Sequence, residues 1–114
     1  MRILAVEDNQ DLRNLLEEYL RTQDHEYVRT AASGKEALEV IHSAPDIFDC
    51  LLFDIQMPEM SGVELIPHIR QIDGYEFVPI IMLTGVKNSE SIAKSFVAGA
   101  WDYIIKPFEF FDLE

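Results

Sequence analysis

Residues 50–62 read CLLFDIQMPEMSG, and this stretch decides the fold. A short apolar run, Cys50–Phe53, is followed at once by Asp54 and by a loop that contains Pro58 and Gly62. Such a run, bounded by turn residues, is typical of a strand buried on both faces of a parallel sheet. Parallel sheets bind ligands beyond the carboxyl ends of their strands, where Asp54 lies. An aspartate there also fits a structural role, hydrogen-bonding its own turn, so this stretch alone leaves both interpretations open.

The composition limits what the chain is. Its 114 residues suffice for one domain with a single core. The net charge of −12 argues against nucleic acid or an anionic membrane as a direct partner of this domain and fits a site that holds a cation. Cys50 is the only cysteine, so we expect an inert, packed thiol and no disulfide within the chain. Without a signal peptide or a membrane-length apolar stretch, the sequence predicts a cytoplasmic protein.

Four further segments have the character of strands. They are Ile3–Val6, the half-polar Tyr27–Ala31 expected at a sheet edge, Val78–Leu83 and Trp101–Ile105. Between successive strands the apolar residues recur with helical spacing. The predicted inner faces are Leu12, Leu15, Leu16, Tyr19 and Leu20; Ala37, Leu38 and Ile41; Leu65, Ile66, Ile69 and Ile72; and Ile92, Phe96, Val97 and Ala100. This alternation predicts an α/β fold, a doubly wound parallel sheet of five strands with helices on both faces.

The helix ends carry their own signals. Asp8 or Asn9 is suited to cap the first helix, and the second is expected to end near Ala44–Pro45. The third helix is predicted to run to Gly74, with Pro67 close enough to its first turn to be tolerated.

Polar residues follow the inner strands where each ends. Glu7 and Asp8 follow the first strand, Asp54 closes the third, Thr84 follows the fourth and Lys106 the fifth. In a doubly wound sheet these ends converge on one crevice. Three carboxylates gathered there repel one another unless a divalent cation joins them, and Mg²⁺ suits a site of few carboxylates that leaves positions for water and phosphate. Taken singly, Thr84 also fits a local backbone hydrogen bond and Lys106 a solvated lysine before a turn proline.

The chain resembles the receiver domain of two-component response regulators. The resemblance rests on the acidic pair after the first strand, on Asp-x-x-Met-Pro-x-Met-x-Gly at 54–62, on Leu-Thr-Gly at 83–85, on Ala-Gly-Ala-x-Asp-Tyr at 98–103, and on Lys-Pro-Phe at 106–108. It implies a flavodoxin-like strand order of 2-1-3-4-5. It also implies that Asp54 is the phosphoacceptor, which takes a phosphoryl group from a histidine kinase, a phosphotransfer domain or a small phosphodonor, and that the domain has no other enzymatic activity.

The resemblance further assigns the other site residues. Asp8, Asp54 and the backbone carbonyl of Gln56 would bind Mg²⁺ or Mn²⁺, with Glu7 acting mainly through the metal's waters. Thr84 would hydrogen-bond one phosphoryl oxygen and Lys106 would pair with another, the Lys106–Pro107 bond being cis. Thr84 and Tyr103 would form a switch. Its readout would be the face of the fourth helix, fifth strand and fifth helix, which would bind a partner or form a homodimer with a second copy.

Residues 1–114 are thus expected to form one receiver domain whose fifth helix, beginning near Phe108, is incomplete at Glu114. We expect the natural chain to continue beyond Glu114 into the rest of this helix and an output domain. Three positions lie outside the motifs of the resemblance. Gln56 and Val86 occupy the two variable positions that tune phosphate lifetime in the family, so this lifetime stays open. Trp101 stands where a small or polar residue is usual, either exposed as a partner anchor or partly buried.

Three other classes are less favoured. An aspartyl-nucleophile phosphohydrolase wants a second acid two residues after its nucleophile, where this chain has Gln56. A flavodoxin-like electron carrier needs a Ser/Thr/Gly-rich phosphate loop where Glu7 and Asp8 would repel phosphate. A receiver that signals without phosphorylation is the nearest alternative, disfavoured because every expected site residue is present.

Overall fold

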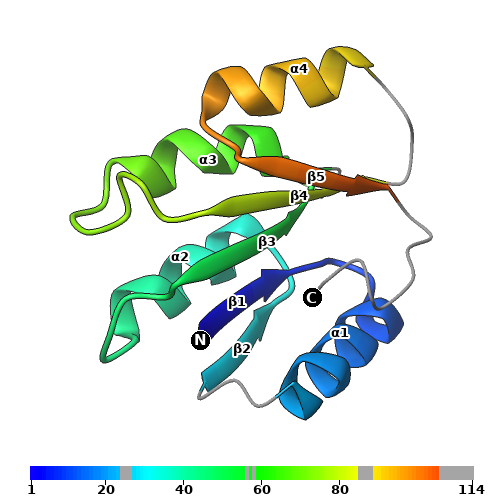
Figure 1. Ribbon diagram of the computed structural model, residues 1–114, viewed down its shortest axis with the longest axis vertical. Helices are drawn as coiled ribbons and strands as arrows, with labels where there is room; N and C mark the ends of the chain where they lie inside the picture. The colour runs from blue at the N-terminus through cyan, green and yellow to red at the C-terminus, as the bar shows by residue number, and fades with distance from the viewer. Residues whose placement is uncertain (24–26, 56, 58, 85–88, 106–114) are drawn as a thin grey trace.

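The computed structural model describes residues 1–23, 27–55, 57, 59–84 and 89–105, in which strands and helices alternate (Figure 1). The strands are β1 Arg2–Val6, β2 Tyr27–Ala31, β3 Cys50–Asp54, β4 Ile80–Thr84 and β5 Asp102–Ile105. The helices are α1 Gln10–Thr22, α2 Gly34–Ser43, α3 Gly62–Arg70 and α4 Ser89–Ala98. The predicted fifth helix lies outside the described residues.

The strands form one parallel sheet of order β2-β1-β3-β4-β5, which confirms the predicted topology. In its register Val6 lies beside Phe53, and Asp54 lies beside Leu83. The carboxyl ends of β1, β3 and β4 therefore meet at the same edge, so residues that follow these strands are brought together although they are far apart in sequence.

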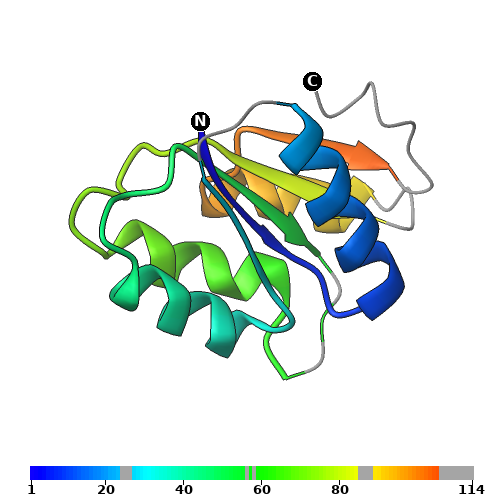
Figure 2. The same cartoon turned by 90° about the horizontal axis from the view of Figure 1, so that it is seen from below.

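Two hydrophobic cores lie on opposite faces of this sheet. Successive side chains of a strand point to opposite faces, so Ile3 and Ala5 of β1 pack with Leu16 and Leu20 of α1. The alternate residues of β1 face the other core, which α2 and α3 cover and against which Ala98 of α4 packs. Among the described residues, one helix thus covers one face of the sheet and three helices cover the other (Figure 2).

Each of the first three helices begins at a side-chain cap. Asn9 accepts a hydrogen bond from the backbone N–H of Leu12 at 3.0 Å and so caps α1. Ser33 caps α2, and Ser61 caps α3 in a capping box with Glu64. Since Asn9 is the cap, the side chain of Asp8 is not needed for that role.

The third helix differs from its prediction. It ends at Arg70 rather than near Gly74, so Ile72 follows the helix, although its side chain still packs on the core. Pro67 is an interior residue of α3 and not part of its first turn. A proline there removes one intrahelical hydrogen bond. The neighbouring Leu65, Ile66 and Ile69 are fully buried, and their packing offsets this loss.

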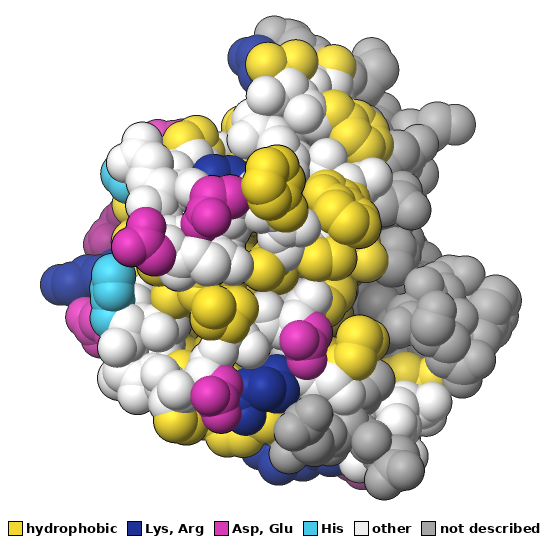
Figure 3. Space-filling model, turned by 60° about the vertical axis from the view of Figure 1, so that its left-hand side comes forward, with side chains coloured by type: hydrophobic (Ala, Val, Ile, Leu, Met, Phe, Trp, Pro, Cys, Tyr) yellow, Lys and Arg dark blue, Asp and Glu magenta, His cyan; other side chains and the backbone are white. Residues whose placement is uncertain are grey.

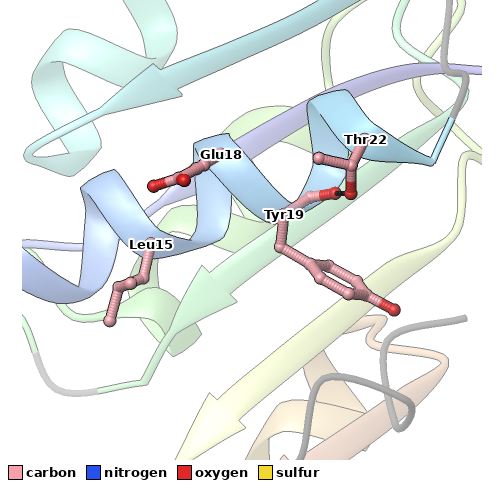
Figure 4. Close-up of a pocket in the computed structure, with 4 residues that line it drawn as sticks. All are labelled: Leu15, Glu18, Tyr19 and Thr22. Carbon is pink, nitrogen blue, oxygen red and sulfur yellow. Dashed lines mark hydrogen bonds between the residues drawn. The ribbon is translucent and has the colours of Figure 1, made fainter.

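Two predicted helix faces are partly wrong. Leu15 is 49% exposed and, with Glu18, Tyr19 and Thr22, lines a hollow of about 220 Å³ on α1 (Figure 4). Phe96 and Val97 are 43% and 90% exposed, because Ala98 and Ala100 make the core contacts at this end of α4. Helical spacing identified the two helices correctly, but it assigned to their buried faces some residues that are exposed.

Cys50 is partly buried and packs against the core on the α1 side, and burial raises the pKa of its thiol from 9.0 to about 11, with a further contribution from the charge of Asp49. The protonated thiol is favoured by folding, so its stabilisation is present below pH 9.0 and is lost as the pH rises toward about 11. We expect iodoacetamide at pH 8 to alkylate folded protein about a hundredfold more slowly than unfolded chain, following the thiolate fraction. Equal rates, measured by intact mass with and without denaturant, would contradict this prediction.

Candidate functional site

Three carboxylates from two adjacent strands meet at the carboxyl edge of the sheet. Glu7 and Asp8 directly follow β1, and Asp54 is the last residue of β3. One carboxylate oxygen from each lies within 4.8 Å of the other two. The predicted acidic cluster is therefore present, since the pairing of β1 with β3 brings together residues nearly fifty positions apart.

The three acids differ in exposure. Glu7 is completely buried and Asp54 is 5% exposed, whereas Asp8 faces solvent. The Oε2 atom of Glu7 accepts a hydrogen bond from the backbone N–H of Asn9 at 3.3 Å, which holds its carboxylate under the turn. Clustered carboxylates of which two are buried are costly unless positive charge or hydrogen bonds compensate them.

The residues of this cluster fit a magnesium ion. Mg²⁺ takes oxygen ligands about 2.1 Å away, so two ligands of one ion lie about 3–4 Å apart. The carboxylate oxygens of Glu7, Asp8 and Asp54 already lie in nearly that range, and the exposure of Asp8 leaves the cluster open to solvent on one side. A hard cation that keeps several waters suits such a site.

Arg13 supports the acidic pair, a role that the sequence pattern did not indicate. Its Nη1 atom donates a hydrogen bond to the backbone carbonyl of Glu7 at 3.0 Å and approaches that of Asp8 at 3.5 Å. The available signal was its position one turn beyond the cap Asn9, from which a long side chain reaches back to the end of β1. Arg13 thereby fixes the backbone that carries two of the three acids.

The loop after Asp54 is held at both ends. The backbone N–H of Ile55 donates to Leu83 at 2.9 Å, and that of Gly62 donates back to Ile55 at 2.8 Å. The sequence predicted a loop bounded by Pro58 and Gly62. Among the described residues of this loop, Glu59 lies in the left-handed region, with φ of 68°. The closed loop keeps Asp54 in a fixed place beside β4.

The remaining predicted site residues are placed only by their backbone or not at all. Thr84 ends β4, one residue beyond the Leu83 that pairs with Asp54. Tyr103 lies in β5 beside Met82. Gln56 and Lys106 lie outside the described residues, as do the Lys106–Pro107 bond and Phe108.

The family model of the response regulator receiver domain matches residues 3–114. The chain belongs to this family. Among solved structures, the receiver domain is similar to the chemotaxis protein CheY4 of Vibrio cholerae, with a TM-score of 0.91 and 34% identity over 98% of this chain and 91% of that one. The predicted resemblance and the flavodoxin-like fold are thus confirmed.

Curated relatives extend well beyond the receiver domain. This chain is 40% identical over 107 residues to the uncharacterized transcriptional regulatory protein YrkP of Bacillus subtilis, and the match covers 94% of this chain and 43% of that protein. It is also 40% identical over 109 residues to a probable cyclic di-GMP phosphodiesterase of Vibrio cholerae, covering 92% of this chain and 23% of that protein. The chain therefore spans less than half the length of these relatives, whose named activities belong to them.

Membership of the family supports the general predictions about the metal, the partners and the lack of enzymatic activity. Receiver domains bind Mg²⁺ at an acidic pocket, interact with histidine kinases or phosphodonors, and are generally not enzymes. The expectation of no nucleic-acid partner is not supported for a whole protein, because relatives named as transcriptional regulators are more than twice as long as the matched region. Among the residues that the structure describes, no helix is both long and apolar enough to cross a membrane.

Proposed function

We propose that this receiver domain accepts a phosphoryl group on Asp54 from a histidine kinase, a phosphotransfer domain or a small phosphodonor. The observation that carries the proposal is the meeting of Glu7, Asp8 and Asp54, whose carboxylate oxygens lie within 4.8 Å of one another. An anionic phosphodonor is repelled by three carboxylates, so the reaction requires Mg²⁺ or Mn²⁺ at this cluster.

The transfer is a displacement at phosphorus. A carboxylate oxygen of Asp54 forms the new O–P bond as the bond from phosphorus to the donor's histidine nitrogen, or to the acyl oxygen of acetyl phosphate, breaks. The donor atom keeps the electron pair of the broken bond. Bound Mg²⁺ supplies positive charge that stabilises the phosphoryl oxygens. Asp8 and Asp54 would hold the cation directly with the backbone carbonyl of Gln56, and the buried Glu7 would act through the waters of the bound metal.

Two further side chains contact the phosphoryl group under this proposal. Thr84, at the end of β4 next to Asp54, donates a hydrogen bond to one phosphoryl oxygen, and Lys106 pairs with another. Phosphorylation adds roughly −1.5 to −2 charges beside Thr84, which draws the hydroxyl inward and lets Tyr103 turn toward the core. The face of α4, β5 and the fifth helix reports this change to a partner or to a second copy.

Dependence on the divalent cation tests the proposal. We expect acetyl phosphate to add one phosphoryl group, seen by intact mass, with Mg²⁺ present and no adduct with a chelator. Mg²⁺ at one hundred times its Kd should also raise the free energy of unfolding by about 2.7 kcal/mol.

Matched variants sharpen this test. Asp8→Asn should lose both Mg²⁺ responses, whereas Asp11→Asn should keep them, because Asp11 is an exposed acid in the first turn of α1 outside the cluster. An equal rate of phosphorylation with a chelator, or equal Mg²⁺ responses in the two variants, would overturn the metal assignment.

A further inference from the structure

Exposed apolar side chains form a row along the edge of the sheet opposite Asp54. Ile47 precedes β3, Phe77 precedes β4 and Trp101 precedes β5, and their exposed fractions are 46%, 83% and 60%. Because β3, β4 and β5 are neighbours in the sheet, these three residues, here called the amino-edge row, follow one another across its amino-terminal edge. Figure 3 shows hydrophobic side chains gathered on the side of the molecule where this edge lies. Single exposed apolar residues are ordinary, but three large ones that share one edge of the sheet indicate an interaction surface.

Arg70 holds two members of the row in place. Its Nη1 atom donates hydrogen bonds to the carbonyls of Tyr75 and Val78 at 3.0 and 2.6 Å, and its Nη2 atom donates to Gly99 at 2.5 Å. One guanidinium therefore joins the loop that carries Phe77 to the turn that precedes Trp101. The backbone N–H of Trp101 is also bonded to Ile80 at 2.8 Å.

Ile47 is fixed to the same loops. The backbone N–H of the next residue, Phe48, donates to the hydroxyl of Tyr75 at 3.0 Å, which ties the segment before β3 to the segment before β4. Ile47 also packs so closely over Gly74 that a Cβ there would overlap its Cδ1 atom. The row is thus ordered before any partner binds, which lowers the entropic cost of association.

Acidic side chains flank the row. Asp46 and Asp49 lie beside Ile47, and Asp73 and Glu76 lie in the loop of Phe77, all four exposed. Two nearby cations are already engaged. The guanidinium of Arg70 bonds the loop carbonyls, and that of Arg2 lies 4.4 Å from the ring centroid of Tyr27 and donates a hydrogen bond to the carbonyl of Asp46. Two copies of this surface would bring carboxylates together in a chain of net charge −12, whereas a basic partner would neutralise them.

We propose that the amino-edge row is a docking surface for a cationic amphipathic segment of a partner protein. The apolar face of that segment packs on Ile47, Phe77 and Trp101, and its Lys and Arg side chains reach the four flanking carboxylates. The row lies at the opposite edge of the sheet from Asp54, and we expect docking there to be independent of phosphorylation, although Trp101 lies between α4 and β5.

Trp101 is the only tryptophan, so its emission reports directly on the row. The probe is a synthetic helical peptide with Leu on one face and Lys on the other, with two controls: the same peptide with Glu in place of Lys, and a scrambled Lys peptide. We expect the first peptide to shift Trp101 emission to the blue. Ile47→Ser with Phe77→Ser should raise its Kd about tenfold or more. Leu15→Ser, an exposed apolar residue of α1 on another face, should change the Kd by less than about twofold.

Several results would overturn the proposal. Equal Kd values for wild type and the double variant would place the peptide elsewhere, as would unmoved Trp101 emission on binding. Equally tight binding of the Glu peptide would show that positive charge is not needed, and equally tight binding of the scrambled peptide would show that an amphipathic face is not needed. A Kd that changes tenfold when beryllium fluoride and Mg²⁺ are added would assign the peptide to the phosphorylation-sensitive face. Self-association of wild type that Phe77→Ser abolishes, followed by sedimentation, would make a second copy the occupant.

Discussion

Asp54→Asn is expected to abolish phosphoryl uptake from acetyl phosphate, leaving no adduct detectable by intact mass. The amide has nearly the shape of the carboxylate, so it fits the same place at the end of β3, but it carries no negative charge and is a poor nucleophile. The loss should therefore be chemical rather than structural, and the far-UV circular dichroism of the variant should match that of wild type.

Asp73→Asn is the matched control for this prediction. Asp73 is exposed in the loop before β4, outside the acidic cluster, and its replacement should leave phosphorylation unchanged. A phosphoryl adduct that persists in Asp54→Asn would show that another residue is the acceptor. Loss of the adduct in both variants would point to a general effect of charge rather than to Asp54.

Gly62→Ala is expected to lower the free energy of unfolding by about 3 kcal/mol and the melting temperature by about 10 °C. Gly62 is the first residue of α3, and a Cβ there would overlap the backbone carbonyl oxygen of Asp54 and lie 2.8 Å from Cε of Met82. Met82 could move, but the carbonyl of Asp54 is fixed by its strand. The variant must therefore shift either the start of α3 or the end of β3, and phosphorylation should slow as well.

Gly34→Ala gives a matched comparison within the same chain. Gly34 is also the first residue of a helix and also follows a serine cap, but its Cβ would meet only side chains, with Sδ of Met60 nearest at 3.0 Å. A flexible methionine gives way easily, and alanine restricts the unfolded chain, so the change in stability should lie within about 1 kcal/mol. Equal thermal shifts in the two variants, measured by calorimetry, would mean that contact with Asp54 does not explain the glycine at position 62.

Local pattern in the sequence was enough to predict most of the fold. Apolar runs such as Cys50–Phe53 and Ile80–Leu83 identify buried strands, because a strand covered on both faces needs no polar side chain. The alternation of these runs with helical periods implies a parallel sheet, and polar residues after the runs mark its binding edge. The pattern was less reliable at the margins of helices, where Leu15, Phe96 and Val97 have the right spacing but are exposed.

By itself, then, the sequence determined the strands, the start of the first helix and the presence of Glu7, Asp8 and Asp54 at strand ends, since each follows from residues close together in the chain. Only the tertiary structure decided that Glu7 is fully buried while Asp8 is exposed, that Arg13 holds the backbone of this pair, and that Arg70 joins the loops before β4 and β5. It also decided that Ile47, Phe77 and Trp101 lie in one row. The physical reason is that burial and hydrogen bonding between loops depend on which strands pair. Strand pairing brings together residues that are far apart in the chain, and a local sequence pattern does not show which of them will meet.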